Sequence, residues 1–243
     1  MDPLDRLSGH QKVGLFFSGG KDSLVCVYLL REFLETITIY HNDTGDQLPE
    51  VRDQVAAVQA FAPHFVRIET DVGGWIAQHG IPTDLLPYSA HFVGHLVGDT
   101  ATKLISRYDC CLANLMIPLW VRAKEDGCTM VIRGIKRVDM PKLPAQDGEV
   151  FDGVELYYPI QEWSDAQVVN YLHACGVKLS RIYEHMDHMV DCATCSAWWT
   201  EKRGAYLKQF HPEKFRQYDA RLQTIINEIA KPLAELRREA GVA

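Results

Sequence analysis

The chain has 243 residues, of which 47% are apolar and 23% are charged, a composition typical of a globular protein. No stretch reaches the ~18 consecutive apolar residues that a membrane-spanning helix requires, and the first residues lack the basic start and apolar run of a secretory signal. A net charge of −7 and a pI near 5.8 argue against an extended nonspecific grip on nucleic acid, which depends on many cationic contacts. We therefore expect a cytoplasmic protein with one main domain.

The first part of the chain alternates short apolar runs with helical patterns. In chain order we expect a strand at 13–17, a helix at 23–33, a strand at 36–40, a helix that begins at Pro49 and a strand at 65–69. Such alternation predicts parallel strands joined by right-handed crossovers, with a ligand crevice at the carboxyl ends of the strands.

The rest of the chain begins with a segment rich in glycine and proline at 71–99, which we expect to be a long irregular lid. Further elements are then predicted: a helix at about 111–125, a strand at 129–132, a polar loop at 135–152, a strand at 155–160, and a helix to about Cys175 with Ser164 as its N-cap. The predicted fold is a doubly wound α/β domain at 1–200 with a mainly parallel five-stranded sheet, followed by a helical C-terminal extension at 201–243.

A glycine pair follows the first strand directly. Residues Ser18-Gly19-Gly20-Lys21-Asp22-Ser23 combine a sharp backbone turn with amide, hydroxyl and ammonium donors at the start of a helix. We interpret this hexapeptide as a loop that binds phosphate. The alternative is a tight strand-to-helix turn without a ligand. It is not a Walker loop, which has four residues between its glycines.

These residues resemble a known family. Ser18 to Ser23 match the Ser-Gly-Gly-x-Asp-Ser signature of the PP-loop superfamily, whose members resemble ATP pyrophosphatases. Asp43-Thr44-Gly45, followed by Pro49-Glu50, is similar to the signature of the phosphoadenylyl-sulfate (PAPS) reductase branch. The resemblance extends over roughly residues 10 to 200 through a basic segment at 133–137 and a Pro, Trp and Ser-Asp pattern at 159–165. It implies an adenine nucleotide alpha hydrolase-like fold and an adenine nucleotide as ligand.

The resemblance also implies roles for particular residues. Asp43 and Thr44 would lie near the adenosine and its phosphates, although a plain turn is the alternative for them. Lys21 and Asp22 would act on the phosphates with Mg²⁺. The basic segment Arg133-Gly134-Ile135-Lys136-Arg137 would hold the phosphate or sulfate of the substrate, with solvated surface charge as the alternative.

Four of the seven cysteines form two pairs, Cys110-Cys111 and Cys192-x-x-Cys195. Four thiolates can enclose a zinc ion or an iron–sulfur cluster. Adjacent cysteines suit the separate irons of a cluster better than a single zinc, and the pattern resembles the one that holds a 4Fe-4S cluster in adenylyl-sulfate reductases. We therefore favour the cluster over zinc, with an uncoordinated or disulfide state as a third alternative. The other cysteines, and His185 and His188, are interpreted as structural.

One departure from the family bears on the reaction. Sulfonucleotide reductases carry a C-terminal cysteine that attacks the sulfate sulfur, whereas no cysteine follows Cys195 here. The retained Lys21 also suits a pyrophosphate leaving group. The leading hypothesis is therefore ATP-dependent adenylation or sulfur transfer, assisted by the cluster. The alternatives are a reductase of adenylyl sulfate or PAPS that takes a thiol from a thioredoxin-like partner, and a noncatalytic nucleotide or redox sensor.

The sequence gives less information about the partners of the chain than about its fold. The leading hypothesis requires a sulfur donor. Basic and aromatic residues alternate between Lys202 and Arg221, which suits helix packing on the core and also a nucleic-acid acceptor. Packing is the favoured interpretation, and both a nucleic-acid acceptor and a homo-oligomer stay open.

Overall fold

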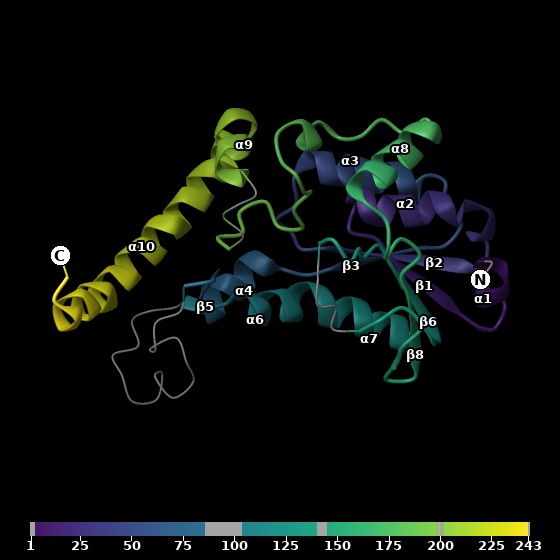
Figure 1. Cartoon of the computed structure of the whole chain (residues 1–243), viewed down its shortest axis with the longest axis horizontal. Coiled ribbons are helices and arrows are strands. Elements are labelled where there is room, and N and C mark those ends of the chain that lie inside the picture. Colours follow the sequence, from purple (N-terminus) through teal and green to yellow (C-terminus); the bar gives the residue numbers. More distant parts are fainter. Residues whose placement is uncertain (1–2, 86–103, 140–144, 198, 200–201, 243) are drawn as a thin grey trace. The chain divides into compact units, whose positions relative to one another are not determined.

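The computed structural model describes residues 3–85, 104–139, 145–197, 199 and 202–242 (Figure 1). Its contacts divide the chain into two compact units that are interleaved in the sequence. The first unit is drawn from residues 1–43, 47–70 and 115–191, and the second from residues 44–46, 71–114 and 192–243. The second unit therefore contains the helices predicted beyond residue 200. It also contains part of the segment at 1–200 that is predicted to form the nucleotide-binding domain.

A mainly parallel sheet forms the centre of the first unit. Over the described ranges it has six strands in the order β3-β2-β1-β6-β8-β7. The strands are β1 (Val13–Phe16), β2 (Ile37–Asp43), β3 (Phe65–Glu69), β6 (Met130–Arg133), β7 (Val150–Phe151) and β8 (Val154–Tyr157). The first five in this order are parallel, which confirms the predicted doubly wound α/β fold. Strand order reverses at β1, which pairs with β2 on one side and β6 on the other.

Helices cover both faces of this sheet (Figure 1). On one face lie α2 (Lys21–Leu29), α3 (Pro49–Gln59) and α8 (Asp165–Ala174), and on the other lies α7 (Ile117–Glu125). The face under α7 packs Tyr40, Val131 and Val154 against Ala123 of the helix. Shorter elements of the unit are α1 (Pro3–Leu7), η1 (Arg31–Phe33) and η4 (Arg181–Glu184).

The second unit is mostly helical. It contains α4 (Val72–His79), α6 (Arg107–Cys111), α9 (Arg203–Phe210) and the 29-residue helix α10 (Pro212–Ala240). Two short strands, β4 (Ile81–Thr83) and β5 (Leu104–Ser106), pair in parallel within it. A π-helical turn, η3 (Leu112–Met116), connects α6 to α7. No helix in the described part of the chain combines the length and apolar character needed to cross a membrane.

Three sequence expectations about elements require correction. The segment predicted as irregular from residue 71 contains α4 and β4, because Asp71 caps the helix by accepting a hydrogen bond from the Gly74 amide at 2.9 Å. The rest of the predicted lid, from residue 86 to 99, lies outside the described residues. The helix predicted at 111–125 begins earlier, at α6, where Ser106 is the N-cap.

The third correction concerns the predicted loop at 135–152. Its end contains β7, a sixth strand that pairs antiparallel with β8. Asp152 and Gly153 both have positive φ values, 49° and 76°, as the two central residues of a tight hairpin turn require. The Asp-Gly pair is therefore a hairpin signal within the segment predicted as a loop.

Candidate functional site

The glycine-rich loop from Ser18 to Ser23 connects β1 to α2 at the carboxyl end of the central strand. Gly19 has a φ of +87°, a conformation that glycine adopts without strain. A Cβ at Gly19 would also lie 3.1 Å from Val51 Cγ1 and 3.3 Å from Val55 Cγ2 of α3. Both the turn and the close packing of α3 therefore require glycine at this position.

Three backbone donors of the loop have protein acceptors. The Ser18 amide donates to Ser23 Oγ at 3.2 Å, and the Gly20 amide donates to Ser18 Oγ at 3.3 Å. The Lys21 amide, at the first position of α2, donates to the Tyr183 hydroxyl at 2.6 Å. Hydroxyl oxygens thus lie against three amides of a loop whose geometry suits an anion.

Two buried lysines and three aspartates form a charge network beside the loop. Lys21 Nζ lies 3.1 Å from Asp22 Oδ2 and 2.8 Å from Asp165 Oδ1. Lys136 Nζ lies 2.9 Å from Asp22 Oδ1, 2.9 Å from Asp139 Oδ2 and 2.8 Å from Asp165 Oδ1. Two ammonium groups face three carboxylates, so protein groups neutralise the charge of both lysines.

The pKa values of Asp165 and Lys136 are shifted toward the charged forms. Burial alone would raise the pKa of Asp165, but hydrogen bonds from Lys136 and Lys21 outweigh it and lower that pKa to about 2. Burial alone would lower the pKa of Lys136, but its hydrogen bonds to Asp165, Asp139 and Asp22 raise it above its ordinary value. All of these shifts stabilise the ion pairs at neutral pH.

The basic segment after β6 has divided roles. Gly134 packs against the loop, because a Cβ there would lie 2.5 Å from the backbone carbon of Asp22. Burial lowers the pKa of the Arg133 guanidinium, and interactions with Tyr158 and Asp191 partly oppose this shift. Arg137 forms an exposed ion pair with Glu162, at 2.7 Å. Gly134 and Lys136 thus lie with the phosphate loop, whereas Arg137 pairs elsewhere on the surface.

The end of β2 carries the Asp-Thr-Gly motif. In the sequence, the boundary between the first and the second unit falls within this motif. Asp43, the last residue of β2, is buried and forms an ion pair with Arg67 of β3. The next residue, Thr44, is the first residue of the second unit. The predicted nucleotide loop therefore continues directly into the unit that contains the four paired cysteines.

Within the second unit, residues 44–46 contact the Cys-x-x-Cys segment. Thr44 Oγ1 lies 3.5 Å from Cys192 Sγ. Asp46 Oδ2 accepts hydrogen bonds from the Thr194 amide at 2.9 Å and from the Thr194 hydroxyl at 2.6 Å. Asp46 Oδ1 lies 2.8 Å from Lys214 Nζ of α10. These contacts fix the segment that carries Cys192 and Cys195.

All four predicted cysteine ligands belong to this unit. Cys110 is buried in a small apolar cluster in which Cys192 also packs. Burial and, to a smaller extent, the nearby Cys195 raise the pKa of the Cys110 thiol to about 11. No three His, Cys, Asp or Glu side chains in the described ranges lie close enough together to hold a metal ion. The four thiols are of the donor type that zinc and iron–sulfur centres take.

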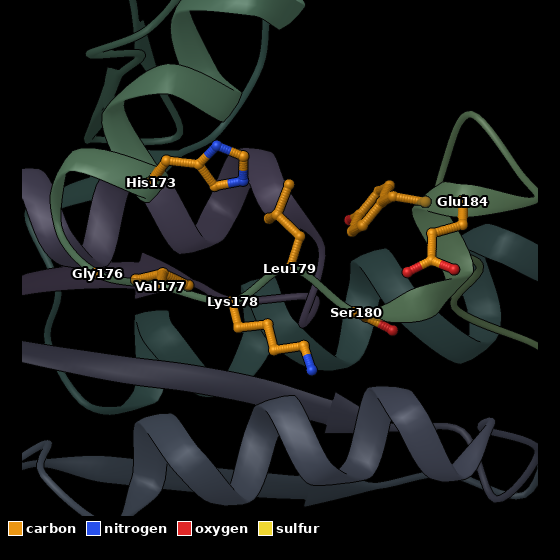
Figure 2. Close-up of a pocket in the computed structure, with 8 residues that line it drawn as sticks. His173, Gly176, Val177, Lys178, Leu179, Ser180 and Glu184 are labelled. Atoms are coloured by element: carbon orange, nitrogen blue, oxygen red, sulfur yellow. The ribbon is translucent and has the colours of Figure 1, made fainter.

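A cavity of about 600 Å³ lies in the first unit between the end of α8 and η4 (Figure 2). In Figure 2 the side chains of His173 and Leu179 extend to one side of this segment and that of Lys178 to the other. Tyr183 also lines the cavity, and it is the residue whose hydroxyl contacts the phosphate loop.

Several residues of the site were not predicted from the sequence. Asp165 was noted only as part of a helix start, although an acidic residue there could have suggested a partner for a basic loop. Tyr183 carried no signal, because it lies 162 residues from the amide that it contacts. Asp46 directly follows the Asp-Thr-Gly motif, so its role in the second unit could have been suspected from that position.

The fold and the loop define a class: a doubly wound α/β protein with a glycine-rich loop after its central strand. Comparison with known proteins narrows this class. Residues 12–84 match the family model of the phosphoadenosine phosphosulfate reductase domain, so the resemblance read from the motifs is confirmed for this segment. None of the curated proteins compared with the chain matches it.

One solved structure with a similar fold is a phosphoadenylyl-sulfate (PAPS) reductase from Candida auris, in complex with phosphate. It is 18% identical to this chain, and the match covers 71% of this chain and 77% of the reductase with a TM-score of 0.47.

Proposed function

We propose that the chain is an adenine-nucleotide enzyme of the sulfonucleotide reductase type, which releases sulfite from adenylyl sulfate or its 3′-phosphate. One observation carries the proposal. The predicted nucleotide site includes Asp43 at the end of β2. The residues that follow, Thr44 and Asp46, contact the segment that carries Cys192 and Cys195. A nucleotide loop and a thiol segment are thereby linked by consecutive residues.

The charge network supports this reaction over adenylation by ATP. A pyrophosphate leaving group needs cationic groups that its charge can reach. Here Lys21 lies within 3.1 Å of Asp22 and 2.8 Å of Asp165, and Lys136 is fully buried among three carboxylates. A substrate with a single phosphate group linked to sulfate needs fewer contacts with the ammonium groups of these lysines.

The reaction requires two thiols. The thiolate of a thioredoxin-like partner attacks the sulfur of the substrate, the bond between that sulfur and the phosphate oxygen breaks, and the adenosine phosphate leaves. A second thiol then attacks the partner's sulfur, which releases sulfite and leaves a disulfide. Residues 196–243 contain no cysteine, so the proposal assigns both thiols to the partner. The loop from Ser18 to Ser23 would bind the phosphate.

A 4Fe-4S cluster is part of the proposal. Cys110, Cys111, Cys192 and Cys195 would hold it, and when bound it would supply an iron–sulfur centre capable of one-electron redox chemistry. Its test is iron and sulfide analysis of protein purified without oxygen. We expect about four irons per chain, since a cubane cluster contains four. Cys195→Ala should lose most of the iron, whereas Cys175→Ala, a change to a cysteine outside the set, should keep it.

The reaction is tested by incubating the anaerobic protein with adenylyl sulfate, or with its 3′-phosphate, and reduced thioredoxin. We expect sulfite and the adenosine phosphate to form in equal amounts. Thr44→Val should lower kcat/KM at least tenfold, and Thr36→Val, at an exposed threonine just before β2, serves as the matched control. Absence of sulfite with both substrates would disprove the proposal.

Adenylation remains a second candidate, because the loop keeps the lysine of ATP-using relatives. It predicts release of pyrophosphate from ATP and Mg²⁺ once a sulfur donor and an acceptor are present. Release of pyrophosphate without any sulfite formation would favour this candidate over the reductase.

A further inference from the structure

Tyr183 reaches the phosphate loop from a distant part of the first unit. It lies in η4, and its hydroxyl accepts a hydrogen bond from the Lys21 amide at 2.6 Å. Lys21 Nζ also lies 5.8 Å from the centre of the Tyr183 ring, within the range of a cation–π contact. The same side chain therefore contacts both the backbone donor and the ammonium group of Lys21.

The position of Tyr183 is fixed by contacts of the residues just before it. Ser180 caps η4 by accepting a hydrogen bond from the Ile182 amide at 3.3 Å. Arg181 forms an ion pair with Glu50 of α3, with its Nε and Nη2 at 2.9 and 2.5 Å from Glu50 Oε1. Burial raises the pKa of the Tyr183 hydroxyl, so the group is neutral at physiological pH. A neutral hydroxyl oxygen on an anchored segment thus faces the loop.

The Lys21 amide is a donor that a phosphate ligand would otherwise use. It is the first amide of a nine-residue helix, where backbone N–H groups and the helix dipole favour an anion. Each phosphate group in a chain of phosphates needs its own donors. Since Tyr183 occupies this amide and Asp22 and Asp165 occupy the ammonium group, the loop has fewer donors for phosphates beyond the first.

We propose that Tyr183 is a specificity-determining residue that limits the phosphate loop to ligands with a single 5′-phosphate group. Its hydroxyl takes the place of an oxygen of a second phosphate at the Lys21 amide and so selects against the triphosphate of ATP. This inference rests on the proposed function and deepens it, since a sulfonucleotide has one 5′-phosphate group.

The test compares AMP and ATP as ligands of the full-length chain by titration calorimetry. For the wild type we expect tighter binding of AMP than of ATP. Tyr183→Phe frees the Lys21 amide and keeps the ring, so its affinity for ATP should rise at least fivefold while its affinity for AMP changes less than twofold. If Tyr183 had a purely structural role, Tyr183→Phe would lower the affinity for AMP and for ATP together. Tyr171→Phe, a tyrosine of α8, is the matched control and should change neither affinity.

A second variant keeps the test valid if Tyr183→Phe does not fold. Arg181→Ala removes the ion pair with Glu50 and loosens η4, so it should shift the preference toward ATP in the same direction by a smaller factor. An unchanged ratio of ATP to AMP affinity in the folded variants would overturn the inference alone. Wild-type protein that binds neither AMP nor a sulfonucleotide would overturn the proposed function as well.

Discussion

At the scale of single residues, the phosphate loop depends on contacts that only part of the sequence pattern reveals. The pattern of glycine, serine and lysine after an apolar strand predicts the loop itself, because these residue types have local reasons to occur together. It does not predict which groups neutralise Lys21, since Asp165 and Tyr183 reach the loop only through the tertiary fold. The loop was therefore predictable, and its electrostatic surroundings were not.

Gly134 gives a direct test of close packing at the loop. A Cβ at this position would lie 2.5 Å from the carbonyl carbon and oxygen of Asp22 and 2.6 Å from the Ser23 amide. These are backbone atoms that cannot rotate away, so Gly134→Ala should destabilise the protein by about 1–3 kcal/mol, the usual cost of overpacking. Urea unfolding measures this change.

The matched control is Gly9→Ala, because the nearest atom to a Cβ there is 3.8 Å away. Equal free energies of unfolding for the Gly134 variant and the wild type would contradict the packing argument. Nucleotide affinity should also fall in the Gly134 variant, since displacement of Asp22 and Ser23 moves the start of α2.

Asp165 gives a prediction for acid stability. Its pKa is lowered to about 2 in the folded protein, from an ordinary value near 3.8. Such a carboxylate stabilises the fold fully above its unfolded-state pKa, and this contribution is lost as the pH falls from about 4 to about 2. Asp165→Asn should therefore be less stable than the wild type near neutral pH, and the difference should shrink over this range.

Urea unfolding of both proteins at several pH values measures the difference. Asp53→Asn, which removes an exposed carboxylate of α3, should show no comparable loss. A stability difference between wild type and Asp165→Asn that stays constant down to about pH 2 would argue against the ion pairs.

At the scale of elements, local signals were reliable where they act within a few residues. The Ser-Asp start of α8 was read as an N-cap, and Ser164 does accept a hydrogen bond from the Gln167 amide within a full capping box. The helix α4 was missed because two glycines mask its pattern, although Asp71 caps it. The pairing of β4 with β5 joins segments that no local pattern relates.

The cap of α8 is testable by itself. Ser164→Ala removes the acceptor for the Gln167 amide and should cost about 1 kcal/mol, the typical value of an N-cap. Gln167→Ala removes the acceptor of the Ser164 amide, at 2.8 Å, and of the Ser164 hydroxyl, at 3.1 Å, and should cost less. The double variant should cost less than the sum of the two, because the bonds form one motif. Additive losses would indicate that the two bonds act independently.

At the scale of the whole molecule, the chain builds two units from alternating segments rather than from two halves. The sequence predicts a boundary at residue 200, because charge and helical pattern change there. Interleaving has no composition signal of this kind, since it depends on which distant segments pack together. A short segment, residues 44–46, belongs to the second unit although the residues on both sides of it belong to the first.

Asp46 is the residue through which this short segment is fixed in the second unit. Its carboxylate accepts from the amide and hydroxyl of Thr194 and pairs with Lys214, while Arg221 donates to the Thr194 carbonyl at 2.7 Å.

Asp46→Ala leaves the buried Thr194 donors without this acceptor, at a cost of about 1–3 kcal/mol. We expect amide hydrogen exchange to accelerate in residues 192–195 and in the first turns of α10, and to stay unchanged in β1 and β6. Glu213→Ala, which removes an exposed carboxylate next to Lys214, should leave exchange in residues 192–195 as in the wild type. Equal acceleration in β1 and β6 would mean that Asp46 stabilises the whole molecule and not the second unit alone, because exchange through global unfolding reaches every strand alike.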